Sequence, residues 1–491
     1  MRRNMKIFFR RFVAAAGVVI LSLLLFSCQT DKAPGTSSVA TTEARKEPLV
    51  VVSDKKTDYK FVRQASASYV ENKLFNEFRA DIASKTGAAP DFVSDSENAT
   101  EYEILLGRTS RTLSQDAYSK LGDNRFSITA ENKTIAISAS DSGCMKLALE
   151  KFTELFVKDG NLIVDSSLLP ITFECKDEIT TVKFDNTKTE RADDPYIVEH
   201  EGSYYYCWSD GEIKVARLDS LERVTRSNGK RVFSSAGKYT GIWAPELHYI
   251  DGEWYIYVAM VEGNGGNEVH RMYCLKGTSQ DPTGRFTLVG QVTDKTDKWA
   301  IDGTVFKYNN ELYTVWSGWE GDTNVSQNIY IAHMSNPWTI DSERVLLSKP
   351  DYWDNYTKNP AINEGPCVAE VDGKIFILFS GNGSWTDDYS IGYLEFDGSD
   401  PLDASSWTKS KRPILQKGEK TYGPGHCSVF KAADGSLWMA YHANLKSGTG
   451  WNGRSFRMQP LEIKNGKPGL MKPQLEVDLP MSKKILVGEV K

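Results

Sequence analysis

The chain of 491 residues carries 59 basic and 65 acidic residues, a formal net charge of -6. Proteins that bind nucleic acid through phosphate contacts normally have a basic surface, so the acidic balance argues against a nucleic-acid partner. The 25% charged and 40% hydrophobic residues exclude extensive disorder and a multi-span membrane protein. With 12 Trp, 22 Tyr, 21 Phe and 38 Gly, the composition favours short strands joined by tight turns.

The first 27 residues have the pattern of a targeting segment. Five basic residues precede an uncharged apolar run over residues 12–26, which is short for a membrane span and typical of a signal-peptide core. The run ends in Leu25-Phe26-Ser27-Cys28, which resembles the lipobox of bacterial lipoproteins. We therefore predict a signal peptide over 1–27 and lipidation of Cys28. A plain secretory signal or an uncleaved anchor is the alternative.

Residues 28–47 are rich in Thr, Ser, Ala, Lys and Glu without an apolar period, so we expect a flexible tether. Removal of the leader takes away five basic and no acidic residues and lowers the formal net charge to -11. The chain is expected in the bacterial cell envelope, held to the membrane by its lipid. Because Gln29, and not Asp, follows the lipidated Cys28, the outer membrane is preferred, on its periplasmic or surface face. The six remaining cysteines have no metal or redox spacing and are expected to be buried free thiols.

Residues 48–178 alternate strand and helix patterns and predict a small α/β domain. The expected elements are a strand at 49–52, a helix within 65–86, a strand at 103–107, a hairpin over 125–137 and a helix at 142–156. Their order resembles the small domain that precedes catalytic domains in hexosaminidases and glucuronidases. No catalytic constellation stands out here, so we expect a spacer or docking role.

Residues 185–480 consist of β-hairpins that repeat. Five turns, each followed by an aromatic or apolar strand, recur at Glu201-Gly202, Asp251-Gly252, Asn309-Asn310, Asp372-Gly373 and Asp434-Gly435. Self-similarity at this period indicates radial repetition, because one such unit cannot bury both faces of its sheet alone. The sequence therefore predicts an all-β five-bladed β-propeller after the small α/β domain, with the upstream strand of each blade lining the axis. A β-sandwich is the alternative.

One ionisable residue stands near the start of each upstream strand. These residues are Asp194, Glu246, Asp302, Glu364 and His426, at intervals of 52, 56, 62 and 62. In a radial fold they converge at one end of the axis, where clustered carboxylates repel each other unless they serve a ligand or a reaction. Two carboxyls across a pocket can hydrolyse a glycosidic bond, one as a protonated acid and the other as a base. Glu246 is expected to be structural or a distant contact.

Sugar rings bind against aromatic faces, and several tryptophans are candidates. They are Trp208, Trp243, Trp316, Trp319 and Trp385, with Trp243 favoured because it adjoins the start of the second blade. Arg454 and Arg457 lie late in the fifth blade, where an Arg fork would hold a sugar hydroxyl or a carboxylate. Each of these residues has a packing or surface role as its alternative.

The motifs ADDPYI, IWAPELH, AIDGTVF, NEGPCV and YGPGHCSVF resemble glycoside hydrolase family 43, in its order and near its spacing. The resemblance implies a five-bladed propeller that inverts anomeric configuration. By motif, Asp194 is similar to the family's general base and Glu364 to its general acid. Asp302 is similar to the carboxylate that tunes the pKa of the acid and orients it. Asp193 is the alternative base, which strand alternation disfavours. His426 matches the family's central His, so the resemblance implies that it contacts, through water, a structural Ca²⁺ in the axis. The resemblance implies no required cofactor.

The phrases HRMYCLKG, NPWTI and DPLDASSWTKS resemble the α-L-arabinofuranosidase-like branch, which removes terminal arabinose units. Arabinose- or xylose-containing plant glycans are then the expected substrates. β-Xylosidase and β-galactosidase activities in the same family stay open, because loops at the mouth decide between them. Two further classes are a sugar-binding propeller without catalysis and an envelope scaffold. Both leave the three carboxylates unexplained.

Overall fold

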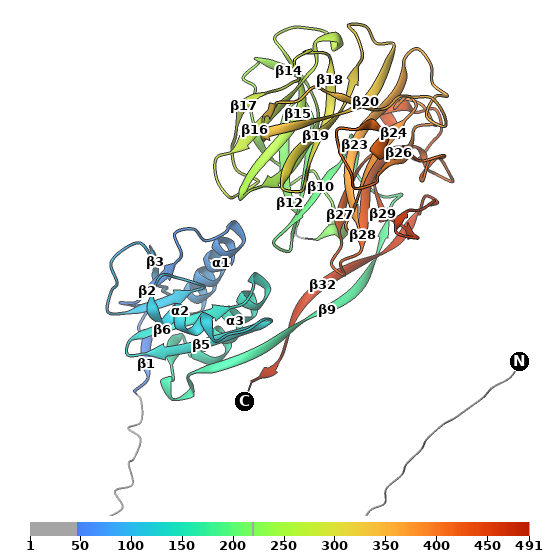
Figure 1. The fold of residues 1–491 in the computed structure, drawn as a ribbon. Coiled ribbons are helices and arrows are strands. Elements are labelled where there is room, and N and C mark those ends of the chain that lie inside the picture. Colours follow the sequence, from blue (N-terminus) through green and yellow to red (C-terminus); the bar gives the residue numbers. More distant parts are fainter. Residues whose placement is uncertain (1–46, 219, 491) are drawn as a thin grey trace, which may run out of the picture. The chain divides into compact units, whose positions relative to one another are not determined.

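The computed structural model describes residues 47–218 and 220–490, which form a small α/β region and a ring of β-sheets (Figure 1). The predicted signal peptide and Cys28 lie outside the described residues. Among the residues described, no helix has the length and apolarity needed to cross a membrane.

The α/β region is built around a mixed sheet with the strand order β3-β2-β4-β6-β5-β9-β32. Helix α1 begins in a capping box, in which Ser68 and Glu71 satisfy each other's backbone N–H groups, and it ends at Gly87 in the left-handed conformation. The predicted helix over 142–156 is confirmed as α3, whose first turn is capped by the Asp141 carboxylate. The elements are β1 (Leu49–Val52), β2 (Lys60–Arg63), α1 (Tyr69–Thr86), β3 (Asp91–Ser94), β4 (Glu103–Leu106), α2 (Thr112–Ser119), β5 (Arg125–Glu131), β6 (Thr134–Ala139), α3 (Ser142–Phe156), β7 (Val157–Lys158), β8 (Asn161–Val164) and β9 (Ile171–Asp185).

The last strand of the chain belongs to this first sheet. Strand β32 (Glu476–Glu489) pairs antiparallel with β9 along nearly its whole length, from Glu476 opposite Asp185 to Glu489 opposite Phe173. The two strands form a long ribbon (Figure 1). The domain boundaries expected near 178 and 480 fall within these two strands.

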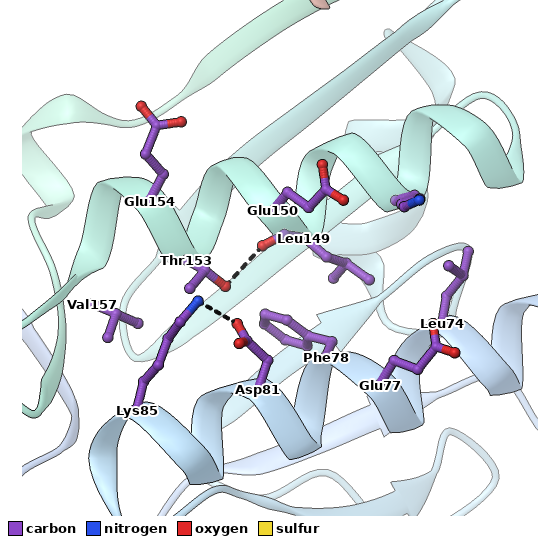
Figure 2. Close-up of a pocket in the computed structure, with 11 residues that line it drawn as sticks. Leu74, Glu77, Phe78, Asp81, Lys85, Leu149, Glu150, Thr153, Glu154 and Val157 are labelled. Carbon is purple, nitrogen blue, oxygen red and sulfur yellow. Dashed lines mark hydrogen bonds and ion pairs between the residues drawn. The ribbon is translucent and has the colours of Figure 1, made fainter. Parts of the chain in front are cut away.

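A groove of about 540 Å³ lies between α1 and α3 (Figure 2). Its floor contains Phe78 and Leu149, and its rim is charged. Most of the rim carboxylates are paired within their own helix: Asp81 with Lys85 at 2.8 Å, Glu77 with Lys73 at 3.8 Å and Glu154 with Lys151 at 2.7 Å. The groove therefore presents little uncompensated charge.

Five antiparallel blades follow one another along residues 196–460 and confirm the five-bladed propeller. A short parallel pairing between β20 and β23 joins the third blade to the fourth. Each inner strand contacts the inner strand of the next blade. The blades are β10 (Tyr196–His200), β11 (Ser203–Ser209), β12 (Ile213–Leu218) and β13 (Lys230–Phe233); β14 (Tyr239–Ile250), β15 (Glu253–Glu262), β16 (Arg271–Gly277) and β17 (Phe286–Val292); β18 (Ala300–Tyr308), β19 (Glu311–Trp319), β20 (Ser326–Asn336) and β22 (Val345–Ser348), with β21 (Thr339–Ile340) beside β20; β23 (Ala361–Val371), β24 (Lys374–Gly381), β25 (Ser390–Phe396) and β26 (Trp407–Lys409); and β27 (Tyr422–Lys431), β28 (Leu437–Asn444) and β29 (Arg454–Pro460).

The turn between the first two strands of each blade fixes the register of that blade. In the first four blades both predicted turn residues have positive φ, as at Asp251 (50°) and Gly252 (86°), which is the geometry of a type I′ turn. The fifth turn is longer, because β27 ends at Lys431 and β28 begins at Leu437.

Asn186 closes the ring of blades, because it joins the segment before the first blade to the last strand of the fifth. Its side-chain amide donates to the carbonyl oxygens of Met458 (2.9 Å) and Gln474 (2.8 Å), and its side-chain oxygen accepts from the Met458 N–H (2.9 Å). Nearby, the Phe456 N–H donates to the Glu190 carbonyl oxygen at 3.0 Å. One buried side chain thus connects three segments that are far apart in the sequence.

Substitution Asn186→Ala should lower the free energy of unfolding of the propeller by about 2–3 kcal/mol, since it leaves buried backbone groups unpaired. Urea unfolding followed by tryptophan fluorescence measures this, because all 12 Trp lie at residue 208 or later. Asn161→Ala, which removes an exposed hydrogen bond to Asp159, is the matched control and should change the value by less than about 0.5 kcal/mol. Equal stability of the two variants would contradict the closure by Asn186.

Candidate active site

The inner strands bend where they reach one end of the propeller axis. The pairing register shifts in β14, β18, β23 and β27 at this end, which marks β-bulges. Each blade has a residue with positive φ near this end of its inner strand: Asp194 (48°), Ala244 (43°), Asp302 (55°), Gly365 (56°) and His426 (48°). Such conformations are costly for residues other than Gly and occur where the surrounding structure imposes them. The bulges re-aim the side chains around them at the axis.

The side chains meet in a cavity of about 680 Å³. Four carboxylates line it, those of Asp193, Asp194, Asp302 and Glu364, together with the positively charged Arg454 and the imidazole of His426. The lining also includes Trp243, Trp299, Ser384, Trp385 and Trp451. A concave site with a few convergent polar groups and an aromatic rim is typical of a small-molecule site.

Asp194 is surrounded by groups that favour its ionised form. Its Oδ1 lies 3.2 Å from His426 Nδ1 and 3.3 Å from Arg454 Nη1. Burial alone would raise the pKa of Asp194, but the charges of His426 and Arg454 outweigh that effect and hold the pKa well below its usual range. Asp194 is therefore ionised at neutral pH.

Two other carboxyls have the opposite tendency. Burial raises the pKa of Glu364 and also that of Asp302, in each case against the opposing charge of His426. The backbone N–H of Gly365 donates to Asp302 Oδ2 at 3.0 Å, so Asp302 fixes the peptide that follows Glu364. One cavity thus holds the ionised carboxylate of Asp194 together with two carboxyls, those of Asp302 and Glu364, whose pKa values are raised.

His426 lies between the carboxylates. Burial by itself would lower the pKa of His426, but Asp194, Asp302 and Glu364 raise it above its ordinary value. Its backbone N–H donates to Ser380 Oγ at 2.8 Å, which fixes the strand at this residue. A protonated His426 therefore offsets part of the negative charge of the cavity.

Asp193 and Asp194 both line the cavity, although they are neighbours in the sequence. Regular strand alternation would separate them, but the positive φ at Asp194 breaks the pleat. The two still differ in surroundings. Asp193 pairs with the exposed Arg191 at 3.1 Å and lies 3.7 Å from Arg454 Nη1. Asp194 lies closer to Arg454, at 3.3 Å, and also contacts the buried His426 at 3.2 Å.

Several predicted site residues lie elsewhere. Arg457 is three positions from Arg454 on β29, so it faces the opposite side, where it is buried and donates to the carbonyl oxygens of Asn186 and Lys420. Trp316 is buried against Tyr330, and neither it nor Arg457 is among the residues that line the cavity. The substrate contacts expected of these two residues are therefore not supported by their positions.

Glu246, expected to be structural or a distant contact, is not among the residues that line the cavity. The bulge of the second blade falls at Ala244, two residues earlier, so Glu246 follows the bend. Its carboxylate lies 2.8 Å from His248 Nε2. Trp208 and Trp319 are likewise buried and outside the lining, whereas Trp243 and Trp385 belong to it.

The sequence interpretation missed His442. Its Nδ1 accepts a hydrogen bond from the Asp194 backbone N–H at 3.3 Å and lies 3.4 Å from Asp194 Oδ1. Burial lowers the pKa of His442 to about 3, so the ring is neutral. It lies inside β28, and no spacing signal separates it from a core residue. Trp299 and Trp451 of the cavity lining were also missed.

The described residues contain no group of three or more His, Cys, Asp and Glu side chains arranged to hold a metal ion. Nδ1 of His426 faces the Asp194 carboxylate instead. The residues therefore do not form a ready ligand set for Ca²⁺, and no chemical step below depends on a metal. The axial Ca²⁺ and its contact to His426 stay predictions.

The opposite shifts of His426 and His442 give a direct test of this charge arrangement. NMR of the six labelled histidines should show one ring, His442, that stays neutral down to about pH 3. Asp194→Asn should lower the pKa of His426, because it removes a negative charge 3.2 Å away. His333, whose pKa is raised by Asp341 and Glu311, is the internal control. An unchanged pKa of His426 in Asp194→Asn would contradict this charge arrangement.

A five-bladed propeller with carboxyls of different protonation tendency around one axial cavity can support hydrolysis of a glycosidic bond, which uses one carboxyl as acid and another as base. The sequence model of the family "Glycosyl hydrolases family 43" matches residues 186–468. The chain belongs to this family.

Several similar proteins carry arabinofuranosidase in their names. The chain is 34% identical over 276 residues to an extracellular exo-alpha-(1->5)-L-arabinofuranosidase of Streptomyces avermitilis, a match that covers 53% of this chain and 56% of that protein. The chain thus spans about half the length of that relative. A protein of the same name from Streptomyces chartreusis is 31% identical over 53% of this chain and 82% of its own length. The crystal structure of an alpha-L-arabinofuranosidase from Lactobacillus brevis superposes with a TM-score of 0.55 and 33% identity, over 59% of this chain and 97% of that one.

Proposed function

We propose that the protein hydrolyses terminal α-L-arabinofuranosyl linkages with inversion of anomeric configuration. The observation that carries the proposal is the contrast between Asp194, whose pKa the surrounding charges hold well below its usual range, and Glu364, whose pKa is raised by burial. Both line the same cavity. Inverting hydrolysis needs a base that is ionised and an acid that is protonated at the same pH.

In this mechanism the two carboxyls act on opposite sides of the sugar. Glu364 donates its proton to the glycosidic oxygen as the bond to the anomeric carbon breaks, and the leaving group departs as an alcohol. Asp194 accepts a proton from the water that attacks the opposite face, and the net reaction adds one water across the bond. The free sugar first appears as the β anomer.

The remaining groups position this pair. Asp302 accepts from the Gly365 N–H and so holds the backbone beside Glu364. Arg454 and His426 keep Asp194 ionised, and Arg454 also offers donors to a sugar hydroxyl. His442 accepts from the Asp194 N–H and fixes the backbone of the base. Trp243, stacked on His270 with ring centroids 3.8 Å apart, presents an aromatic face at the rim.

The choice of arabinofuranose rests on the relatives, which carry that activity in their names. Arabinose-containing plant glycans are then the substrate class. A panel of aryl α-L-arabinofuranoside, β-D-xyloside and β-D-galactoside tests the sugar directly. The arabinofuranoside should be cleaved fastest, and proton NMR of a fresh digest should show the inverted anomer first. Faster cleavage of either other glycoside would overturn the sugar assignment, and the retained anomer would overturn the mechanism.

Glu364→Gln should lower kcat on an arabinan oligosaccharide by about 10²–10⁴-fold, because the leaving oxygen no longer receives a proton. An aryl glycoside with an acidic leaving group needs less protonation, so its kcat should fall less. Glu131→Gln, an exposed position on β5, is the matched control and should keep wild-type rates. Wild-type rates in Glu364→Gln would rule out its role as the acid.

We also propose that the chain is exported and held at the outer membrane by a lipid on Cys28. The support is the basic and apolar leader that ends in Leu25-Phe26-Ser27-Cys28, and the position of Gln29 after it. The tether over 28–47 then lets the enzyme reach glycans away from the membrane.

Cys28→Ser should move the protein from the membrane fraction to the soluble fraction and abolish its labelling by a fatty-acid probe. Cys175→Ser is the control, since that thiol is buried in β9 and should leave both readouts as in the wild type. Retention of Cys28→Ser in the membrane would contradict the lipid anchor.

A further inference from the structure

Two tryptophans at the mouth of the cavity leave much of their surface in water. Trp385 is 40% exposed and Trp451 is 54% exposed, and both belong to the lining. Their rings meet edge to face, with centroids 5.8 Å apart and an angle of 76°. Large aromatic side chains exposed together at the rim of a concave site are typical of a binding surface.

Hydrogen bonds join the two loops that carry these rings. The Trp451 Nε1–H donates to Ser384 Oγ at 3.2 Å. Asp387 accepts from the Gly448 N–H at 3.0 Å and from the Ser447 hydroxyl. The loop over 382–388, after β24, is thus bonded to the loop over 445–453, before β29. A platform that is already rigid pays little ordering entropy when a ligand binds.

The platform is also connected to the catalytic candidates. Arg454 donates through Nη2 to the Ser384 carbonyl oxygen at 3.2 Å and through Nη1 to Asp194 Oδ1 at 3.3 Å. Trp385 lies tight against the Gly383 backbone, because a Cβ at Gly383 would approach its ring to 2.9 Å. The ring positions are therefore fixed relative to the base.

In an exo-acting site the terminal sugar occupies the buried part of the cavity, between the carboxyls. The rest of the glycan must then leave through the mouth, where the two indoles lie. Indole faces match the apolar C–H faces of a sugar ring, and Ser384 adds a hydroxyl at the edge.

We propose that Trp385 and Trp451 form a platform that binds the sugar next to the cleaved one, on the leaving-group side. This inference rests on the proposed glycosidase function and deepens it: the preferred substrate is an oligo- or polysaccharide chain and not a short glycoside. The platform binds neutral sugars by stacking, and it therefore favours substrates that extend beyond the cleaved sugar.

A neighbouring loop extends the same surface. The Tyr356 N–H donates to Asn382 Oδ1 at 2.8 Å, and the Gly383 N–H donates to Thr357 Oγ1 at 2.9 Å, so residues 356–357 lie against the loop of Trp385. Tyr356 is 71% exposed. The structure assigns to it a contact with the glycan beyond the sugar on the tryptophan platform.

The test compares an aryl α-L-arabinofuranoside with linear arabinan oligosaccharides of two to six units. Trp451→Ala should lower kcat/KM on the oligosaccharides about tenfold more than on the aryl glycoside, mainly through KM; tenfold corresponds to roughly 1.4 kcal/mol. Trp451→Phe, which keeps a ring, should recover much of the loss. Tyr356→Ala should lower kcat/KM more on the long oligosaccharides of the series than on the short ones.

Tyr249→Ala is the matched control. Tyr249 is an exposed aromatic residue, 40% exposed as Trp385 is, but it lies at the other end of β14, near the turn at Asp251. Any change in kcat/KM in Tyr249→Ala should not depend on chain length. An equal loss on aryl glycoside and oligosaccharides in Trp451→Ala would overturn the platform while the glycosidase function stands. A wild-type enzyme that cleaves none of these substrates would instead overturn the proposed function itself.

Discussion

The candidate active site depends on the attraction between the Asp194 carboxylate and the positive charges of His426 and Arg454. Carboxylates in one cavity repel each other, and burial makes each charge more costly. Arg454 and a protonated His426 compensate this charge unevenly, because both contact Asp194 directly while Asp302 lies 4.0 Å from His426. The uneven compensation separates the pKa values, so chemically similar carboxyls acquire different protonation states and different roles.

The backbone delivers these side chains by the same device in every blade. A bulge or a residue with positive φ interrupts the inner strand where it reaches the mouth of the axis. Gly365 meets this demand without a side-chain clash, but Asp194, Asp302 and His426 adopt it as well, at a cost in free energy. The ring, closed by Asn186, supplies the stability that offsets this local strain.

The sequence could predict features that depend on local pattern. The helix over 142–156 follows from its apolar spacing, and the five turns follow from their Asx and Gly residues. The carboxylates Asp194, Asp302 and Glu364 could be found because each stands at the same place in a repeat. Features that depend on tertiary geometry could not. Strand alternation separates Arg457 from Arg454, and Trp316 is buried against Tyr330.

His442 and β32 illustrate the same limit over longer distances. His442 contacts Asp194, 248 residues away, and nothing in its own segment marks it. Strand β32 pairs with β9, which precedes the whole propeller. This pairing has a consequence for synthesis on the ribosome. The edge of the first sheet is completed by a strand that emerges after the propeller, so β9 lacks its neighbour β32 while all five blades are being made. The propeller must therefore bring the two ends of its own chain together before the N-terminal sheet is finished.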